Sequence, residues 1–98
     1  MATTCSFFTN HARAMLLIAA HPDTRLRDLA AALDLTERTA STIVADLTAA
    51  GFLLKERVGR RNHYAAQHHL PLPDVAHLPR EAGEHREYTL GDLLSLFT

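Results

Sequence analysis

Hydrogen-bonding side chains gather at the start of a segment whose apolar residues recur at helical spacing. Ala40, Ile43 and Leu47 fall on one face of such a helix, because successive residues turn by about 100°. The outward N-terminal face carries hydroxyl, carboxylate and guanidinium groups: Thr36, Glu37, Arg38, Ser41 and Thr42. Arginine donates two hydrogen bonds to a guanine edge, and glutamate accepts one from a cytosine amine. The chemistry fits a helix that enters the major groove of DNA, although outer-face polarity alone is more typical of a solvated helix.

A cationic group follows in a segment with strand-like alternation. The sequences FLLKERV and RRNHYAA flank Gly59-Arg60, which predicts a β-hairpin with a glycine-led turn. The side chains expected at its tip are Arg57, Arg60, Arg61 and Asn62. Such a tip can reach the minor groove or the sugar-phosphate backbone, and each phosphate contact adds roughly one unit to the salt dependence of binding. The alternative is that the arginines protect an edge strand against aggregation. The adjoining pair of helices favours DNA contact.

Three predicted helices position these groups. We expect the first over residues 10–20, capped by Thr9 or Asn10, the second over 27–33 and the third from Thr36 to about residue 50. Asp34 and Gly51 stand where the second and third helices must end in a left-handed residue. A short third strand at Arg25 and Leu26 is expected beside the hairpin. After residue 67 we expect an extended connector, and then a short helix capped by Thr89 with Asp92 in a capping box.

Residues 10–66 resemble the winged helix-turn-helix domain of small bacterial repressors of the MarR and ArsR families. The resemblance is carried by LRDLAAALDLTERTASTIVADLTAAGFLLKER for two helices and the first wing strand, and by VGRRNHYAA for the wing tip and return strand. It implies a mainly helical α+β fold of three helices and a hairpin wing, with a short C-terminal helix. It also implies that the polar residues named above contact double-stranded DNA. The chain departs from the family pattern in three ways: Asp34 replaces a small turn residue, the third helix carries the acidic Glu37 and Asp46, and the long flanking helices of typical MarR proteins are absent.

A second set of residues predicts self-association. The first helix is apolar nearly all round, and a short chain gains stability from dimerisation. We therefore expect residues 1–66 to form the DNA-binding domain, and residues 67–98 to form a connector and a dimerisation helix. The expected homodimer interface comprises Phe7, Phe8, Met15, Leu90, Leu93, Leu94 and Phe97.

Composition and missing motifs exclude other classes. The chain of 98 residues has a net charge of −1, but residues 25–64 hold seven Lys or Arg against five Asp or Glu, and residues 65–98 hold two against five. No phosphate loop, nucleophile elbow or paired-carboxylate site indicates an enzyme, and no cofactor is expected. No signal peptide or membrane span is evident, so we expect a cytoplasmic protein. The main alternative is a winged helix that binds another protein rather than DNA.

The histidines and the single cysteine raise the question of a metal or redox site. Four of the seven histidines, His68, His69, His77 and His85, fall in the connector near Asp74 and Glu81. They lack the i, i+4 spacing of a helical metal motif, and there is no CxxC. Solvated histidines and an inert Cys5 are therefore the expectation. Whether an effector or metal is sensed is left open.

Overall fold

The computed structural model describes residues 5–73 and 88–97. The chain divides into two units, residues 1–66 and residues 67–98. In the described residues, no helix combines the length and the apolar character that a bilayer crossing requires.

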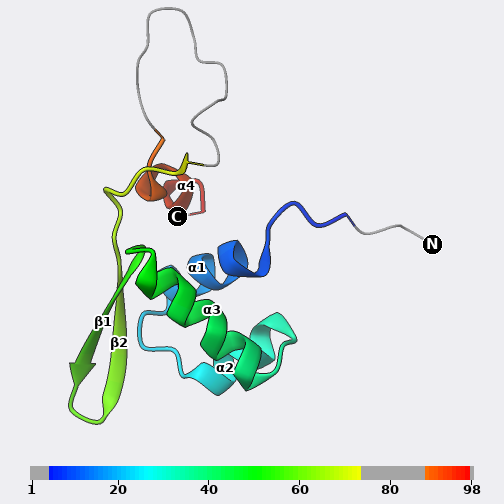
Figure 1. The fold of residues 1–98 in the computed structure, drawn as a ribbon, viewed down its shortest axis with the longest axis vertical. Coiled ribbons are helices and arrows are strands. Elements are labelled where there is room, and N and C mark those ends of the chain that lie inside the picture. The colour runs from blue at the N-terminus through cyan, green and yellow to red at the C-terminus, as the bar shows by residue number, and fades with distance from the viewer. Residues whose placement is uncertain (1–4, 74–87, 98) are drawn as a thin grey trace, which may run out of the picture. The chain divides into compact units, whose positions relative to one another are not determined.

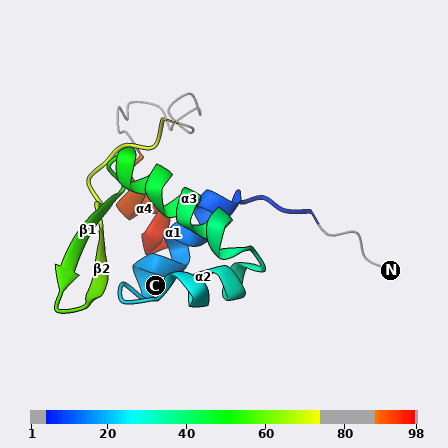
Figure 2. The same ribbon diagram turned by 60° about the horizontal axis from the view of Figure 1, so that its bottom comes forward.

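The first unit consists of three helices followed by an antiparallel hairpin. The helices are α1 (Asn10–Ala20), α2 (Leu26–Leu33) and α3 (Glu37–Ala49), and the strands are β1 (Leu53–Val58) and β2 (Arg61–Ala66). The helices pack against one another, and the hairpin leaves the C-terminal end of α3 (Figures 1 and 2). The predicted order of elements and the mainly helical α+β class are confirmed.

Local backbone chemistry sets the helix ends. The Thr9 hydroxyl accepts a hydrogen bond from the Ala12 amide at 3.1 Å, so Thr9 rather than Asn10 caps α1. Asp34 adopts φ 57° between α2 and α3, and the Leu35 amide donates to the Ala30 carbonyl at 2.8 Å. Gly51, with φ 89°, ends α3 in the same way. These left-handed stops confirm both predicted helix ends, because each satisfies carbonyls that the helix leaves unpaired.

The core of the first unit lies where the three helices meet. Its side chains come from every helix, and β1 adds Leu53 at 2 % exposure. The remaining core residues are Ala14, Met15, Ile18, Leu29, Ala30, Leu33, Ala40, Ile43, Val44 and Leu47. Burying one such large aliphatic side chain contributes about 1.5–3 kcal/mol. Because α3 commits one face to this core, its opposite face must point to solvent.

The hairpin pairs Lys55 with Tyr64 and Arg57 with Asn62. Gly59 takes φ 64° at the turn, a conformation that glycine adopts without strain. The expected third strand at Arg25 and Leu26 is wrong, since Arg25 is the N-cap of α2 and Leu26 its first residue. A neighbouring part of the same loop contacts β2 instead.

That loop reaches β2 through two hydrogen bonds. The Tyr64 amide donates to the Pro22 carbonyl at 3.0 Å. His63 Nδ1 lies 2.7 Å from Asp23 Oδ1. The hairpin is therefore fastened to the helical part of the unit along β2.

The second unit contains α4 (Leu90–Ser95) with the predicted capping box. The Asp92 amide donates to the Thr89 hydroxyl at 3.2 Å, and the Thr89 amide donates to Asp92 Oδ2 at 2.9 Å. The start of the expected connector also pairs with the segment that enters α4: the Leu72 amide donates to the Tyr88 carbonyl, and the Leu90 amide donates to the Leu70 carbonyl, both at 2.8 Å. The middle of the connector lies outside the described residues.

Candidate functional site

The outer face of α3 exposes all five polar residues predicted to contact DNA: Thr36, Glu37, Arg38, Ser41 and Thr42. Two of their hydroxyls already have partners on the helix. Thr36 accepts from the Thr39 amide at 3.1 Å as the N-cap, and Thr42 donates to the Arg38 carbonyl at 3.1 Å. The side chains of Glu37, Arg38 and Ser41 carry no such bond to the part of the chain that the structure describes. Their side-chain donors and acceptors are therefore open to a ligand.

The second acidic residue of α3 is turned toward α1. His11 Nε2 lies 2.8 Å from Asp46 Oδ2, which links the two helices across 35 positions of sequence. Both side chains remain about half exposed. The carboxylate of Asp46 is therefore engaged at the flank of α3, whereas Glu37 is exposed on the outer face.

The hairpin tip carries the predicted cationic residues. Arg57, Arg60 and Arg61 are exposed, and Asn62 is half-buried. Arg57 Nε donates to the Gly59 carbonyl at 3.3 Å, which bends that side chain along its own turn. Arg60, Arg61 and Asn62 border a groove that separates the hairpin from the helices.

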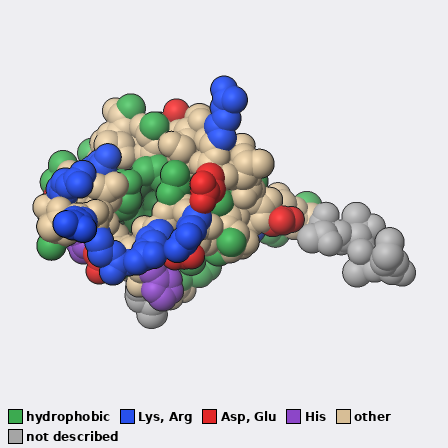
Figure 3. Space-filling model, turned by 90° about the horizontal axis from the view of Figure 1, so that it is seen from below, with side chains coloured by type: hydrophobic (Ala, Val, Ile, Leu, Met, Phe, Trp, Pro, Cys, Tyr) green, Lys and Arg blue, Asp and Glu red, His purple; other side chains and the backbone are tan. Residues whose placement is uncertain are grey.

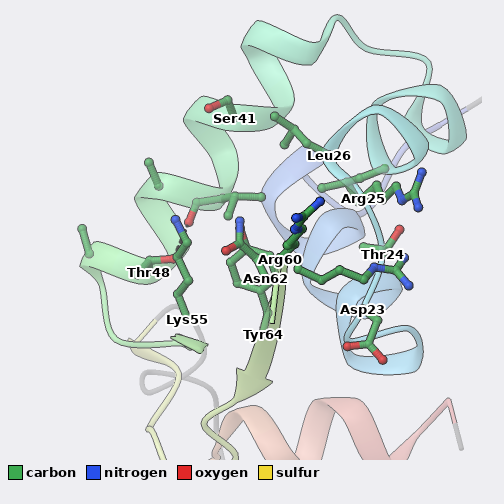
Figure 4. A pocket seen from close by; sticks show the side chains of 15 residues that line it. Asp23, Thr24, Arg25, Leu26, Ser41, Thr48, Lys55, Arg60, Asn62 and Tyr64 are labelled. Carbon is green, nitrogen blue, oxygen red and sulfur yellow. Dashed lines mark hydrogen bonds between the residues drawn. The ribbon is translucent and has the colours of Figure 1, made fainter. Parts of the chain in front are cut away.

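This groove has a volume of about 870 Å³ (Figures 3 and 4). Three parts of the first unit line it: the side of α3 that faces the hairpin, the inner face of the hairpin, and the start of α2 with the loop before it. The lining residues are Asp23, Thr24, Arg25, Leu26, Leu29, Ser41, Val44, Ala45, Thr48, Ala49, Lys55, Arg60, Arg61, Asn62 and Tyr64. We call this hollow the inter-element groove.

The inter-element groove gathers four of the nine predicted DNA-binding residues. Ser41 lines it from α3, with Arg60, Arg61 and Asn62 from the hairpin. The remaining five lie outside its lining: Thr36, Glu37, Arg38, Thr42 and Arg57. The structure thus brings the hairpin tip next to the middle of α3, while the N-terminal turn of α3 stands apart from the groove.

Two basic residues of the groove were not predicted. Lys55 projects from β1 and Arg25 precedes α2, and both line the same hollow as Arg60 (Figure 4). Strand alternation could have identified Lys55, since it lies two residues before Arg57 on one face of β1. No local pattern identifies Arg25, because its position depends on how the loop between α1 and α2 folds back.

The charge of the groove is positive. Its lining holds Arg25, Lys55, Arg60 and Arg61 against one carboxylate, Asp23, which contacts His63. Figure 3 shows Lys and Arg side chains along two sides of a hollow whose floor is hydrophobic. Such an arrangement attracts anions more strongly than the net charge of −1 indicates.

The expected dimer residues differ in exposure. Met15, Leu90 and Leu94 are at most 5 % exposed, so they offer almost no surface to a partner. Leu93 is intermediate, whereas Phe7, Phe8 and Phe97 are exposed. Any dimer contact through the predicted residues therefore falls mainly to these three aromatic side chains.

No metal-binding cluster is found among residues 5–73 and 88–97. His68 and His69 are exposed, and so is Cys5. His77, His85, Asp74 and Glu81, the other residues weighed for a metal site, lie outside the described residues.

No protein-family model, no curated protein and no solved structure matches the chain. The exposed polar face of α3 and the basic groove beside it are the features of the first unit that are open to a ligand.

Proposed function

We propose that this chain is a transcriptional regulator that binds double-stranded DNA through a winged helix-turn-helix domain resembling those of MarR and ArsR repressors. In this proposal α3 is the recognition helix and the β1–β2 hairpin is the wing. The observation that carries it is the shared groove, lined by Ser41 of α3 and by Arg60 and Arg61 of the hairpin. When α3 lies in the major groove of a duplex, the guanidinium groups of the hairpin contact the adjoining phosphates of the DNA backbone.

The side chains divide the work of recognition in this proposal. Arg38 is exposed without a side-chain partner in the described residues, so it can donate a bidentate pair to a guanine. Glu37 accepts from a cytosine amine, and the hydroxyls of Ser41 and Thr42 contact bases or phosphates. Arg60 and Arg61 bind phosphates without regard to sequence.

The proposal extends to a cytoplasmic homodimer with a binding role rather than a catalytic one. Two-fold symmetric binders read half-sites about one helical turn, or roughly 34–36 Å, apart. The exposed Phe7, Phe8 and Phe97 supply apolar surface for such a contact.

Selection of bound duplexes from a random-sequence pool tests the proposal. We expect enrichment of an inverted repeat whose half-sites lie about 10 base pairs apart, with a guanine at one fixed position of each half-site. The same selection with Arg38→Ala should lose that guanine. Recovery of no preferred sequence by the unmodified protein would contradict sequence-specific regulation.

The second candidate is a winged-helix module that binds protein. It is favoured by the net charge of −1 and by the acidic residues 65–98, which oppose a close approach to DNA. If the folded, unmodified protein binds no DNA even at low salt, this candidate is favoured.

A further inference from the structure

The inter-element groove has an apolar floor that DNA binding does not require. Leu26, Val44, Ala45 and Tyr64 contribute to its lining, and Leu26 keeps 39 % of its surface exposed at the first position of α2. Figure 3 shows hydrophobic side chains at the bottom of the hollow. Apolar surface held open in a groove is typical of a site that buries apolar groups of a ligand.

Cationic side chains surround that floor. Lys55, Arg60 and Asn62 project from the hairpin toward the space between α3 and the segment at Arg25 and Leu26 (Figure 4). The hairpin contributes three cations to the lining, and Arg25 adds a fourth from the opposite side. A ligand seated on the floor therefore meets positive charge from two directions.

An apolar floor with a cationic rim selects among anionic partners. Duplex DNA presents phosphates to the rim, but its backbone offers few apolar groups to bury against Leu26 and Ala45. An amphipathic helix rich in Asp and Glu satisfies both features, since its apolar stripe covers the floor while its carboxylates meet the rim. Charge complementarity and the apolar floor together favour the peptide.

We propose that the inter-element groove binds an acidic amphipathic helix of a partner protein. The apolar stripe of that helix lies over Leu26, Ala45 and Tyr64, and its carboxylates pair with Arg25, Lys55 and Arg60. The site overlaps the proposed DNA contact at Arg60, but its floor and its other two cations, Arg25 and Lys55, belong to none of the residues assigned to DNA. One wall of the groove is α3, whose 13 residues span about 20 Å. A partner helix of about three to four turns matches that length.

The test is the binding of a synthetic peptide to the intact 98-residue protein. The probe is a fluorescein-labelled peptide of about 14 residues, with leucines at i, i+3, i+4 and i+7 and glutamates on the other face. A peptide of the same composition in scrambled order, without an apolar stripe, is the control probe. We expect the amphipathic peptide to bind at least about tenfold more tightly than the scrambled one, because only its stripe covers the floor.

A matched pair of variants locates the site. Ala45→Glu places a carboxylate on the floor and should weaken peptide binding by about tenfold or more. Ala31→Glu adds the same group to α2 at an exposed position outside the groove and should leave binding unchanged. Both are exposed helix positions where glutamate is well tolerated, and circular dichroism verifies the fold.

Three outcomes overturn the proposal. They are no peptide binding by the unmodified protein, equal binding of both peptides, and equal loss in both variants. None of them affects the DNA proposal, which is tested with duplexes and with Arg38→Ala. If Ala45→Glu and Lys55→Ala weaken duplex binding while no peptide binds, the groove belongs to the DNA interface.

Discussion

The outer face of α3 and the tip of the hairpin differ in charge and in the kinds of polar group that they expose. On α3, Glu37 and Arg38 carry opposite charges, and two threonine hydroxyls are fixed by hydrogen bonds within the helix. The hairpin tip is cationic, and Arg60 and Arg61 are long and exposed. A mixed set of donors and acceptors can discriminate between base edges, whereas cations alone bind any phosphate. In the proposed DNA complex, α3 therefore supplies specificity and the hairpin supplies affinity.

The two regions also differ in how deeply their apolar residues are buried, and the largest expected change in the free energy of unfolding follows from this. Ile43 anchors α3 at 3 % exposure, whereas Val58 near the hairpin tip is 64 % exposed. Ile43→Ala should lower the free energy of unfolding by about 2–5 kcal/mol, because it leaves a cavity beneath the helix. Val58→Ala should change it by less than about 0.5 kcal/mol. Urea denaturation measures both, and similar losses would show that the hairpin is part of the core.

The hairpin's share in affinity is tested by removing its two exposed arginines. The double variant Arg60→Ala/Arg61→Ala should weaken binding to every duplex and lower the salt slope by about two units, because two phosphate contacts are lost. Fluorescence anisotropy at several salt concentrations measures the slope. Arg13→Ala on α1, where Arg13 contacts Asn10 at 3.1 Å, is the control and should keep the slope. An unchanged slope in the double variant would remove the hairpin from the interface.

The share of α3 in specificity is tested at Arg38. Arg38→Ala should cost about 1–3 kcal/mol on the preferred operator and much less on a duplex in which the contacted guanine is replaced. Competition binding with the two duplexes measures this difference. If both affinities fall equally, Arg38 contacts the DNA backbone, and the assignment of specificity to α3 is wrong.

The smallest expected effect concerns the fixed hydroxyl at the start of α3. Thr36→Ala removes the acceptor for the Thr39 amide and should lower the free energy of unfolding by about 1 kcal/mol. Thr36→Ser keeps the cap and should restore most of that stability. Thermal denaturation compares the three proteins, and equal stability of all three would show that the cap does not hold α3.

Local patterns predicted most of the fold, and long-range contacts account for what they missed. The caps at Thr36 and Thr89 and the left-handed Asp34 and Gly51 follow from residue types a few positions apart. The loop beside β2 was misplaced because the bond from the Tyr64 amide to the Pro22 carbonyl joins distant residues. The contact between His11 and Asp46 was missed for the same reason, since these residues are 35 positions apart in the sequence.

The candidate site was predicted in part for the same reason. Arg38 and Ser41 follow from the phase of one helix, and Arg60 from one turn. The inter-element groove instead requires α2, α3 and the hairpin to meet, so Arg25 could be assigned to it only from the structure. The exposure of Leu26 on its apolar floor could not be predicted, because in the sequence Leu26 belongs to the apolar stripe expected on the buried face of a helix.

Binding of a labelled duplex of mixed sequence by the unmodified protein, followed across a salt titration, tests the central claim most directly. We predict a Kd of about 100 μM or tighter at low salt. Binding should weaken steeply as the salt concentration rises, because phosphate contacts release counterions. A folded protein that shows no binding even at the lowest salt concentration would contradict the account.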